Sequence, residues 1–268
     1  MEWALSPSVL GSQFNWDKQR EYNDISAHAM HPRSMTFSCA AETVKNILDT
    51  PNLPSTIQDR ARALIAPLEQ LALSFINSGD AAEYNAECLN SSQISYLASG
   101  FQSLAALTGN NTYKVAAKES IRAIMALQHV GGEFDGAFGE KSGVDTSYGF
   151  QTLEELVKYR ENLGGDGSKP GAWYTQVSDF ITRGANWLIS KVLPDGSIDT
   201  SDNSRTDSVE APILGDFPKG WTIDSIPIRL AFYASSFNRY EELAPIINSI
   251  QYYGENYDHI RDIPPPSS

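Results

Sequence analysis

Two similar stretches decide the fold that we expect: Gly131-Gly132-Glu133-Phe134-Asp135-Gly136-Ala137-Phe138 and Leu193-Pro194-Asp195-Gly196-Ser197-Ile198. Each follows a run with helical spacing and carries an Asp-Gly pair, and the two pairs lie 60 residues apart. Asp-Gly supplies the positive-φ position of a tight turn, so both stretches are predicted to be short extended loops between helices. Repetition on this scale is typical of stacked supersecondary units. We therefore expect helical hairpins whose Asp-Gly loops gather at one end.

The composition favours one globular domain. The chain has 268 residues, of which 41% are apolar and 20% charged, and this balance is ordinary for a domain with a substantial core. No internal stretch rich in Ser, Gly or Pro marks a linker. We expect one domain over residues 1–262 and a Pro/Ser tail over residues 263–268.

The charge and the apolar pattern exclude several classes of partner. A net charge of −13 argues against non-specific nucleic-acid binding, which needs a basic surface. No uninterrupted apolar run approaches the ~18 residues of a membrane-spanning helix. The first residues lack a signal peptide, but a mature exported form would begin in the same way. We expect a secreted, periplasmic or cell-surface protein, with the cytoplasm as the alternative. The two cysteines, Cys39 and Cys88, either form one disulfide or remain thiols.

Apolar residues recur at helical spacing along most of the chain. This spacing predicts helices over residues 38–48, 55–77, 94–107, 115–127, 148–159, 174–189, 226–233 and 240–253. The fold class is therefore predicted to be all-α, with turns and the two extended loops between the helices.

The Asp-Gly loops followed by helices resemble the α/α-toroid proteins, which include polysaccharide lyases, six-hairpin glycosidases and terpenoid cyclases. The resemblance rests on Asp135-Gly136-Ala137-Phe138, Ser147-Tyr148 and Asp195-Gly196-Ser197, and it covers most of the chain from Ser91 to Ile250. It implies an α/α toroid of about five to six antiparallel hairpins. Because one fold hosts many activities, the resemblance specifies the fold more firmly than the reaction.

The first functional hypothesis is a polysaccharide lyase that acts by β-elimination. In toroidal lyases a Tyr or His removes the C5 proton of a uronate, while polar or cationic groups neutralise its carboxylate. The resemblance then implies a catalytic set made of Tyr148, His31, Arg205 and Asn203. The substrate-binding set would be His28, Arg33, Asp145, Lys219, Trp221 and Trp173. In the structural alternative, Tyr148 packs at a helix start and Arg205 forms an ion pair with Asp202 or Asp207.

Two other functions stay open. A glycoside hydrolase needs a pair of carboxylates, for which the candidates are Asp135, Glu140, Asp199 and Glu210. Turns and helix caps use the same residue type, and Asp135 and Asp145 fit those structural roles. A non-catalytic glycan-binding module would instead stack sugars on aromatic rings such as Trp173 and Trp221. The expected partner in every case is a polysaccharide or oligosaccharide, and no metal spacing or phosphate loop implies a cofactor.

Overall fold

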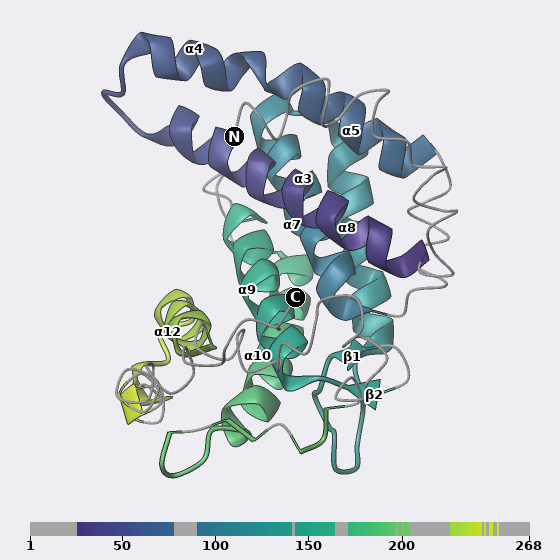
Figure 1. Ribbon diagram of the computed structural model, residues 1–268, viewed down its shortest axis with the longest axis vertical. Coiled ribbons are helices and arrows are strands. Elements are labelled where there is room, and N and C mark those ends of the chain that lie inside the picture. The colour runs from purple at the N-terminus through teal and green to yellow at the C-terminus, as the bar shows by residue number, and fades with distance from the viewer. Residues whose placement is uncertain are drawn as a thin grey trace, which may run out of the picture. The chain divides into compact units, whose positions relative to one another are not determined.

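The computed structural model describes most of the chain, namely residues 26–77, 90–140, 143–163, 171–196, 198–199, 201–203, 226–242, 244, 247–248 and 251, with side chains from residue 34 onward except those of residues 77, 147, 226–228 and 242. These residues are mostly helical, with one two-stranded sheet, which confirms the all-α fold class (Figure 1). The chain divides into two compact units: Met1–Ala126 with Asn162–Ser168 form unit 1, and Leu127–Glu161 with Lys169–Ser268 form unit 2. The tail predicted over residues 263–268 lies outside the described residues.

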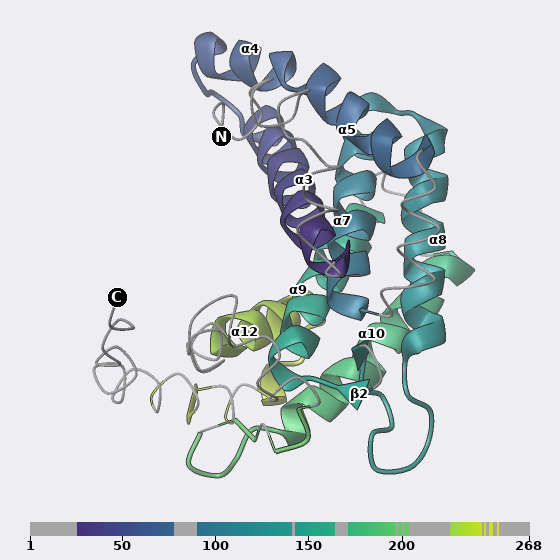
Figure 2. The ribbon, with the colours of Figure 1, turned by 45° about the vertical axis from the view of Figure 1, so that its right-hand side comes forward.

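Unit 1 is built on close contact between two helices. Its helices are α3 (Ser26–Asp49), α4 (Ser55–Ala63), α5 (Ile65–Asn77), α7 (Ser91–Thr108) and most of α8 (Asn111–Leu127). Helix α3 makes its most extensive contact with α7 and lies beside it in both views (Figure 2). The ring of Phe75 on α5 completes this contact: the buried ring of Phe37 on α3 has its centroid 5.7 Å from that of Phe75 and 5.2 Å from that of Phe101 on α7.

Two helices of unit 1 differ from the sequence prediction. Helix α3 begins at Ser26 rather than near residue 38, and Ser34 and Ser38 on it are fully buried. Its packing face therefore includes small polar residues, which an apolar pattern does not reveal. The single helix predicted over residues 55–77 is interrupted at Leu64. Pro67 causes this interruption, because its ring would clash with the carbonyl group four residues earlier in a continuous helix.

Unit 2 contains the two Asp-Gly loops. Its elements are β1 (Gly139–Glu140), β2 (Gly143–Val144), α9 (Thr146–Leu163), α10 (Ala172–Ser190), α12 (Ile226–Ser236) and the 3₁₀ helix η2 (Tyr240–Glu242), with the last two residues of α9 belonging to unit 1. Strands β1 and β2 pair antiparallel.

Helices α9 and α10 form an antiparallel hairpin. Near the start of α9, a methyl group added at Gly149 would lie 2.9 Å from Cδ2 of Leu188, near the end of α10. Toward the other end of α9, the Tyr159 hydroxyl accepts a hydrogen bond of 3.0 Å from Nε1 of Trp173, near the start of α10. The Arg160 guanidinium then joins this hairpin to α12, since it donates to the Ser236 carbonyl at 3.1 Å.

The first Asp-Gly loop is held against the middle of α10. Gln128 donates to the carbonyls of Gly136 at 2.9 Å and Phe180 at 3.3 Å. Gly136 has a φ of 94°, and a methyl group there would lie 2.5 Å from the Arg183 carbonyl oxygen. The buried ring of Phe138 lies directly over Gly184. The contact between loop and helix therefore requires a glycine in each, Gly136 in the loop and Gly184 in α10.

This close contact predicts that Gly184→Ala destabilises the protein. The added methyl group would lie 2.1 Å from Cζ of Phe138, so the ring must move out of its packed position. Overpacking of this kind costs about 1–3 kcal/mol, which urea unfolding measures. Gly171→Ala, at the N-cap of the same helix, is the control because its methyl group would meet nothing within 4 Å. Equal losses in both variants would contradict the packing argument.

Candidate functional site

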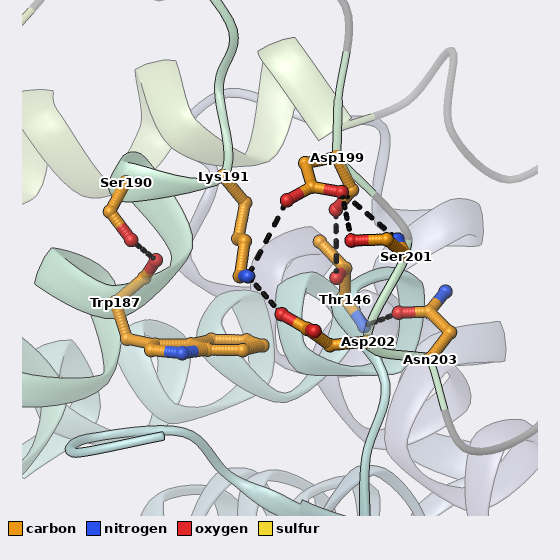
Figure 3. Close-up of polar contacts among 8 residues, drawn as sticks. All are labelled: Thr146, Trp187, Ser190, Lys191, Asp199, Ser201, Asp202 and Asn203. Carbon is orange, nitrogen blue, oxygen red and sulfur yellow. Dashed lines mark hydrogen bonds and ion pairs between the residues drawn. The ribbon is translucent and has the colours of Figure 1, made fainter. Parts of the chain in front are cut away.

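The segments that follow the two Asp-Gly turns meet where α9 begins (Figure 3). Val144 pairs with Asn203 through a parallel β-bridge. The Thr146 N–H donates to Oδ1 of Asn203 at 2.7 Å, and the Thr146 hydroxyl donates to the Asp199 carbonyl at 3.2 Å. We call these residues, together with Asp145, the α9 junction.

Asp145 caps the helix at this junction. Its side chain is fully buried, and its Oδ1 accepts a hydrogen bond of 3.0 Å from the N–H of Tyr148. The first N–H groups of a helix have no partner within it, so a carboxylate here satisfies one donor and is also favoured by the helix dipole. Tyr148 thereby has a fixed position in the first turn of α9, where its side chain is half-buried.

The second Asp-Gly loop returns the chain to the end of α10. Gly196 has a φ of 91° and its N–H donates to the Leu193 carbonyl at 2.9 Å, which closes the turn. Val192 and Ile198 then pair as an antiparallel bridge. One residue further, the Asp199 N–H donates to the carbonyl of Lys191 at 2.8 Å.

Asp199 and Asp202 bind the side chain of Lys191. The Lys191 ammonium forms an ion pair with Oδ2 of Asp202 and lies 3.6 Å from Oδ2 of Asp199. Only 14% of the lysine side chain is exposed, and its nitrogen lies 5.3 Å from the ring centroid of Trp187. Asp199 also accepts hydrogen bonds from the N–H and hydroxyl of Ser201, at 3.0 and 2.6 Å.

These contacts shift the pKa values of Lys191 and Asp199 in the directions that favour their charged forms. Burial lowers the pKa of Lys191, but the hydrogen bond and charge of Asp202, together with Asp199, outweigh it and raise that pKa above 10.5. Hydrogen bonds from Ser201 lower the pKa of Asp199 below 3.8, and Lys191 adds to the effect. Lys191 and Asp199 are therefore both charged around neutral pH.

The structure brings four of the predicted site residues to one place. These are Asp145, Tyr148, Asn203 and Asp199. Asn203 is buried, and its amide oxygen accepts the hydrogen bond from the Thr146 N–H. This residue therefore stabilises the first turn of α9.

Other predicted residues lie in different settings. Glu140 is fully buried in β1, whose partner strand leads into Asp145. Asp135 is exposed in the first loop, where it accepts a hydrogen bond of 2.7 Å from the Gly131 N–H, as its turn role predicts. Trp173 is near the start of α10, about 27 Å along that helix from Lys191. It is not part of the α9 junction.

The remaining predicted residues are not described. The side chains of His28, His31 and Arg33 lie outside the described residues, as do Arg205, Glu210, Lys219 and Trp221. The grouping of Tyr148 with Arg205 and a histidine stays a prediction. Cys39 is exposed, and the question of its pairing stays open because Cys88 also lies outside the described residues.

Sequence reasoning missed Lys191 as a partner of this loop. In the structural alternative Arg205 pairs with Asp202 or Asp207, and this stays a prediction because Arg205 lies outside the described residues, but Asp202 binds Lys191. The available signal was a lysine directly after a helix, followed within eleven residues by three aspartates. A cation in that place could have been predicted to bind the acidic loop.

Comparison with protein-family models, with curated proteins and with solved structures found no significant match. Among the described residues, no three His, Cys, Asp or Glu side chains are placed to hold a metal ion. Within that same part of the chain, no helix has the length and apolar character needed to cross a membrane.

The shifted pKa of Asp199 predicts a loss of stability in acid. Its carboxylate stabilises the fold fully above its ordinary pKa of 3.8, and this contribution is lost as the pH falls through the lower folded-state pKa. The difference in unfolding free energy between wild type and Asp199→Asn should stay constant from about pH 5 to pH 9 and shrink below about pH 4. Urea unfolding across this range measures it.

The control is Asp59→Asn, which removes an exposed carboxylate that pairs only within its own helix turn. Exposed pairs of this kind contribute little, so this variant should differ little from wild type at any pH. A wild-type advantage over Asp199→Asn that is as large at about pH 3 as at neutral pH would contradict the role of the carboxylate.

Proposed function

We propose that this protein is a carbohydrate-active enzyme that cleaves a uronate-containing polysaccharide by β-elimination. The observation that carries the proposal is the placement of Tyr148, the residue expected to be the base, in the first turn of α9 at the junction of the two loops. Two side chains fix the backbone of this turn: Asp145 accepts a hydrogen bond from the N–H of Tyr148, and Asn203 accepts one from the N–H of Thr146. A base must be held in place to reach a substrate proton, and this arrangement provides that support.

In the proposed reaction, the Tyr148 phenolate takes the proton at C5 of the uronate. The electron pair left at C5 forms the C4–C5 double bond as the C4–O bond breaks, and the phenol returns the proton to the departing oxygen. The N-terminus of α9 carries a partial positive charge, which favours the anion that develops on the substrate. Arg205 would offset the substrate carboxylate.

The finer architecture belongs to the same proposal. The α9–α10 hairpin and the recurrence of the Asp-Gly turn support a toroid of five to six hairpins whose loops form the substrate-binding end. Such an enzyme would work on an extracellular or periplasmic polysaccharide, without a nucleic-acid or membrane partner.

Hydrolysis is the weaker alternative because three of the described carboxylates have structural tasks. Asp145 caps α9, Asp135 closes its own loop, and Asp199 binds Ser201 and Lys191. A glycan-binding module is also less favoured. Trp187 is buried against Lys191 and offers no open ring face, while Trp173 is half-buried and its indole N–H donates to the Tyr159 hydroxyl.

The proposal predicts that the protein produces unsaturated uronides. Incubation with a panel of uronate polysaccharides should raise the ultraviolet absorbance of the C4–C5 double bond, and Tyr148→Phe should lower that rate at least ~10²-fold because the base is lost. Tyr174→Phe is the matched control, since it removes a half-buried hydroxyl from α10 of the same unit. Its rate should stay close to that of wild type.

Two other results would decide against β-elimination, and a third would decide against its proposed base. New reducing ends without the absorbance would identify a hydrolase. Retention of a glycan without any cleavage would identify a binding module. An unchanged rate in Tyr148→Phe would remove this tyrosine as the base.

A further inference from the structure

We infer that Lys191 is a positioning residue of the α9 junction: it holds the second loop in the place from which Asn203 fixes the first turn of α9. The catalytic consequence rests on the proposed function, whereas the clamp itself does not. The inference follows from a continuous set of contacts that starts at the end of α10 and ends at Thr146 (Figure 3), two residues before Tyr148.

The first step is the rigid attachment of Lys191. It directly follows α10, and its N–H donates to the Leu188 carbonyl at 3.1 Å. Its own carbonyl accepts the Asp199 N–H at 2.8 Å, so backbone and side chain both bind Asp199. The lysine therefore connects a packed helix to the loop.

The second step is the balance of charge. The ammonium is largely shielded from water, with the Trp187 ring on one side and the two carboxylates on the other. Such an ion pair is stronger than an exposed one, and removal of one partner leaves the other charges uncompensated. Without Lys191, Asp199 and Asp202 would repel each other within a short loop, which favours an open loop.

The third step passes from the loop to the helix. Asp202 is bonded directly to Asn203, so anchoring the aspartate limits where the asparagine can lie. Asn203 accepts the Thr146 N–H, and the Thr146 hydroxyl donates to the Asp199 carbonyl. Thr146 precedes Tyr148 by two residues in the same helical turn. Movement of the loop would thus release the turn that carries the proposed base.

Lys158 offers a matched comparison within the same unit. Its ammonium also contacts two carboxylates, Glu154 at 2.8 Å and Glu155 at 3.0 Å, and 17% of its side chain is exposed. All three residues belong to α9, whose backbone hydrogen bonds hold them together without the ion pair. Loss of Lys158 should therefore remove a similar charge pair without opening a loop.

The test compares Lys191→Met with Lys158→Met by amide hydrogen exchange in the intact chain. In Lys191→Met, the N–H groups of Thr146 and Asp199 should exchange at least about ten-fold faster, because both depend on the closed loop. The Gly136 N–H, which donates to His129 at 2.9 Å in the first loop, should not change. Lys158→Met should leave all three rates as in wild type, and Lys191→Arg should restore them by keeping the charge.

A kinetic measurement separates positioning from general stability. With a uronate polysaccharide that the wild-type protein cleaves, Lys191→Met should lower kcat about ten-fold or more with little change in KM, since misplacement of a catalytic group affects the chemical step. Lys191→Arg should recover most of kcat. An unchanged kcat beside faster Thr146 exchange would overturn the positioning role.

Unchanged Thr146 exchange in Lys191→Met would overturn the inference altogether. If that variant does not fold, Asp202→Asn, which removes one carboxylate of the clamp, is judged by the same exchange criterion. Faster Thr146 exchange in a protein whose wild type cleaves no uronate would support the clamp and would reject the proposed function instead.

Discussion

The hydrogen bond from the Thr146 N–H to Oδ1 of Asn203 is the interaction on which the arrangement of unit 2 depends. It joins a donor at the start of α9 to a residue 57 positions later, and both groups are buried. A buried donor without a partner costs more than an ordinary hydrogen bond contributes, so this link strongly favours the loop conformation that provides it. This hydrogen bond keeps the segments that follow the two Asp-Gly turns next to each other at the start of α9.

The acidic residues of these loops mainly shape the backbone. Asp135 binds the N–H of Gly131, Asp145 that of Tyr148, and Asp199 that of Ser201. An aspartate used in this way is acceptor and turn former at once, which explains how an acidic chain can gather carboxylates at one junction without large repulsion. Lys191 supplies the cation that offsets two of them.

The features of the fold that depend only on neighbouring residues could be predicted from the sequence. The break between α7 and α8 follows from Gly109, whose φ is 70°, and the Asp-Gly turns lie where their positive-φ glycines require. The sequence did not reveal the early start of α3, whose buried serines carry no apolar signal, and Pro67 was overlooked as the cause of a helix break. Lys191 was missed because its partners depend on how the loop returns to α10, which is a tertiary contact.

The most direct test of the central claim is the unfolding free energy of two substitutions at Asn203. Asn203→Ala removes the acceptor and leaves the Thr146 N–H buried without a partner, so the protein should lose about 1–3 kcal/mol in urea unfolding. Asn203→Asp keeps an acceptor beside a helix N-terminus, where negative charge is favourable, and should lose much less. If Asn203→Ala were as stable as wild type, or if both variants lost the same amount, the link between the two loops would not be what holds the junction together.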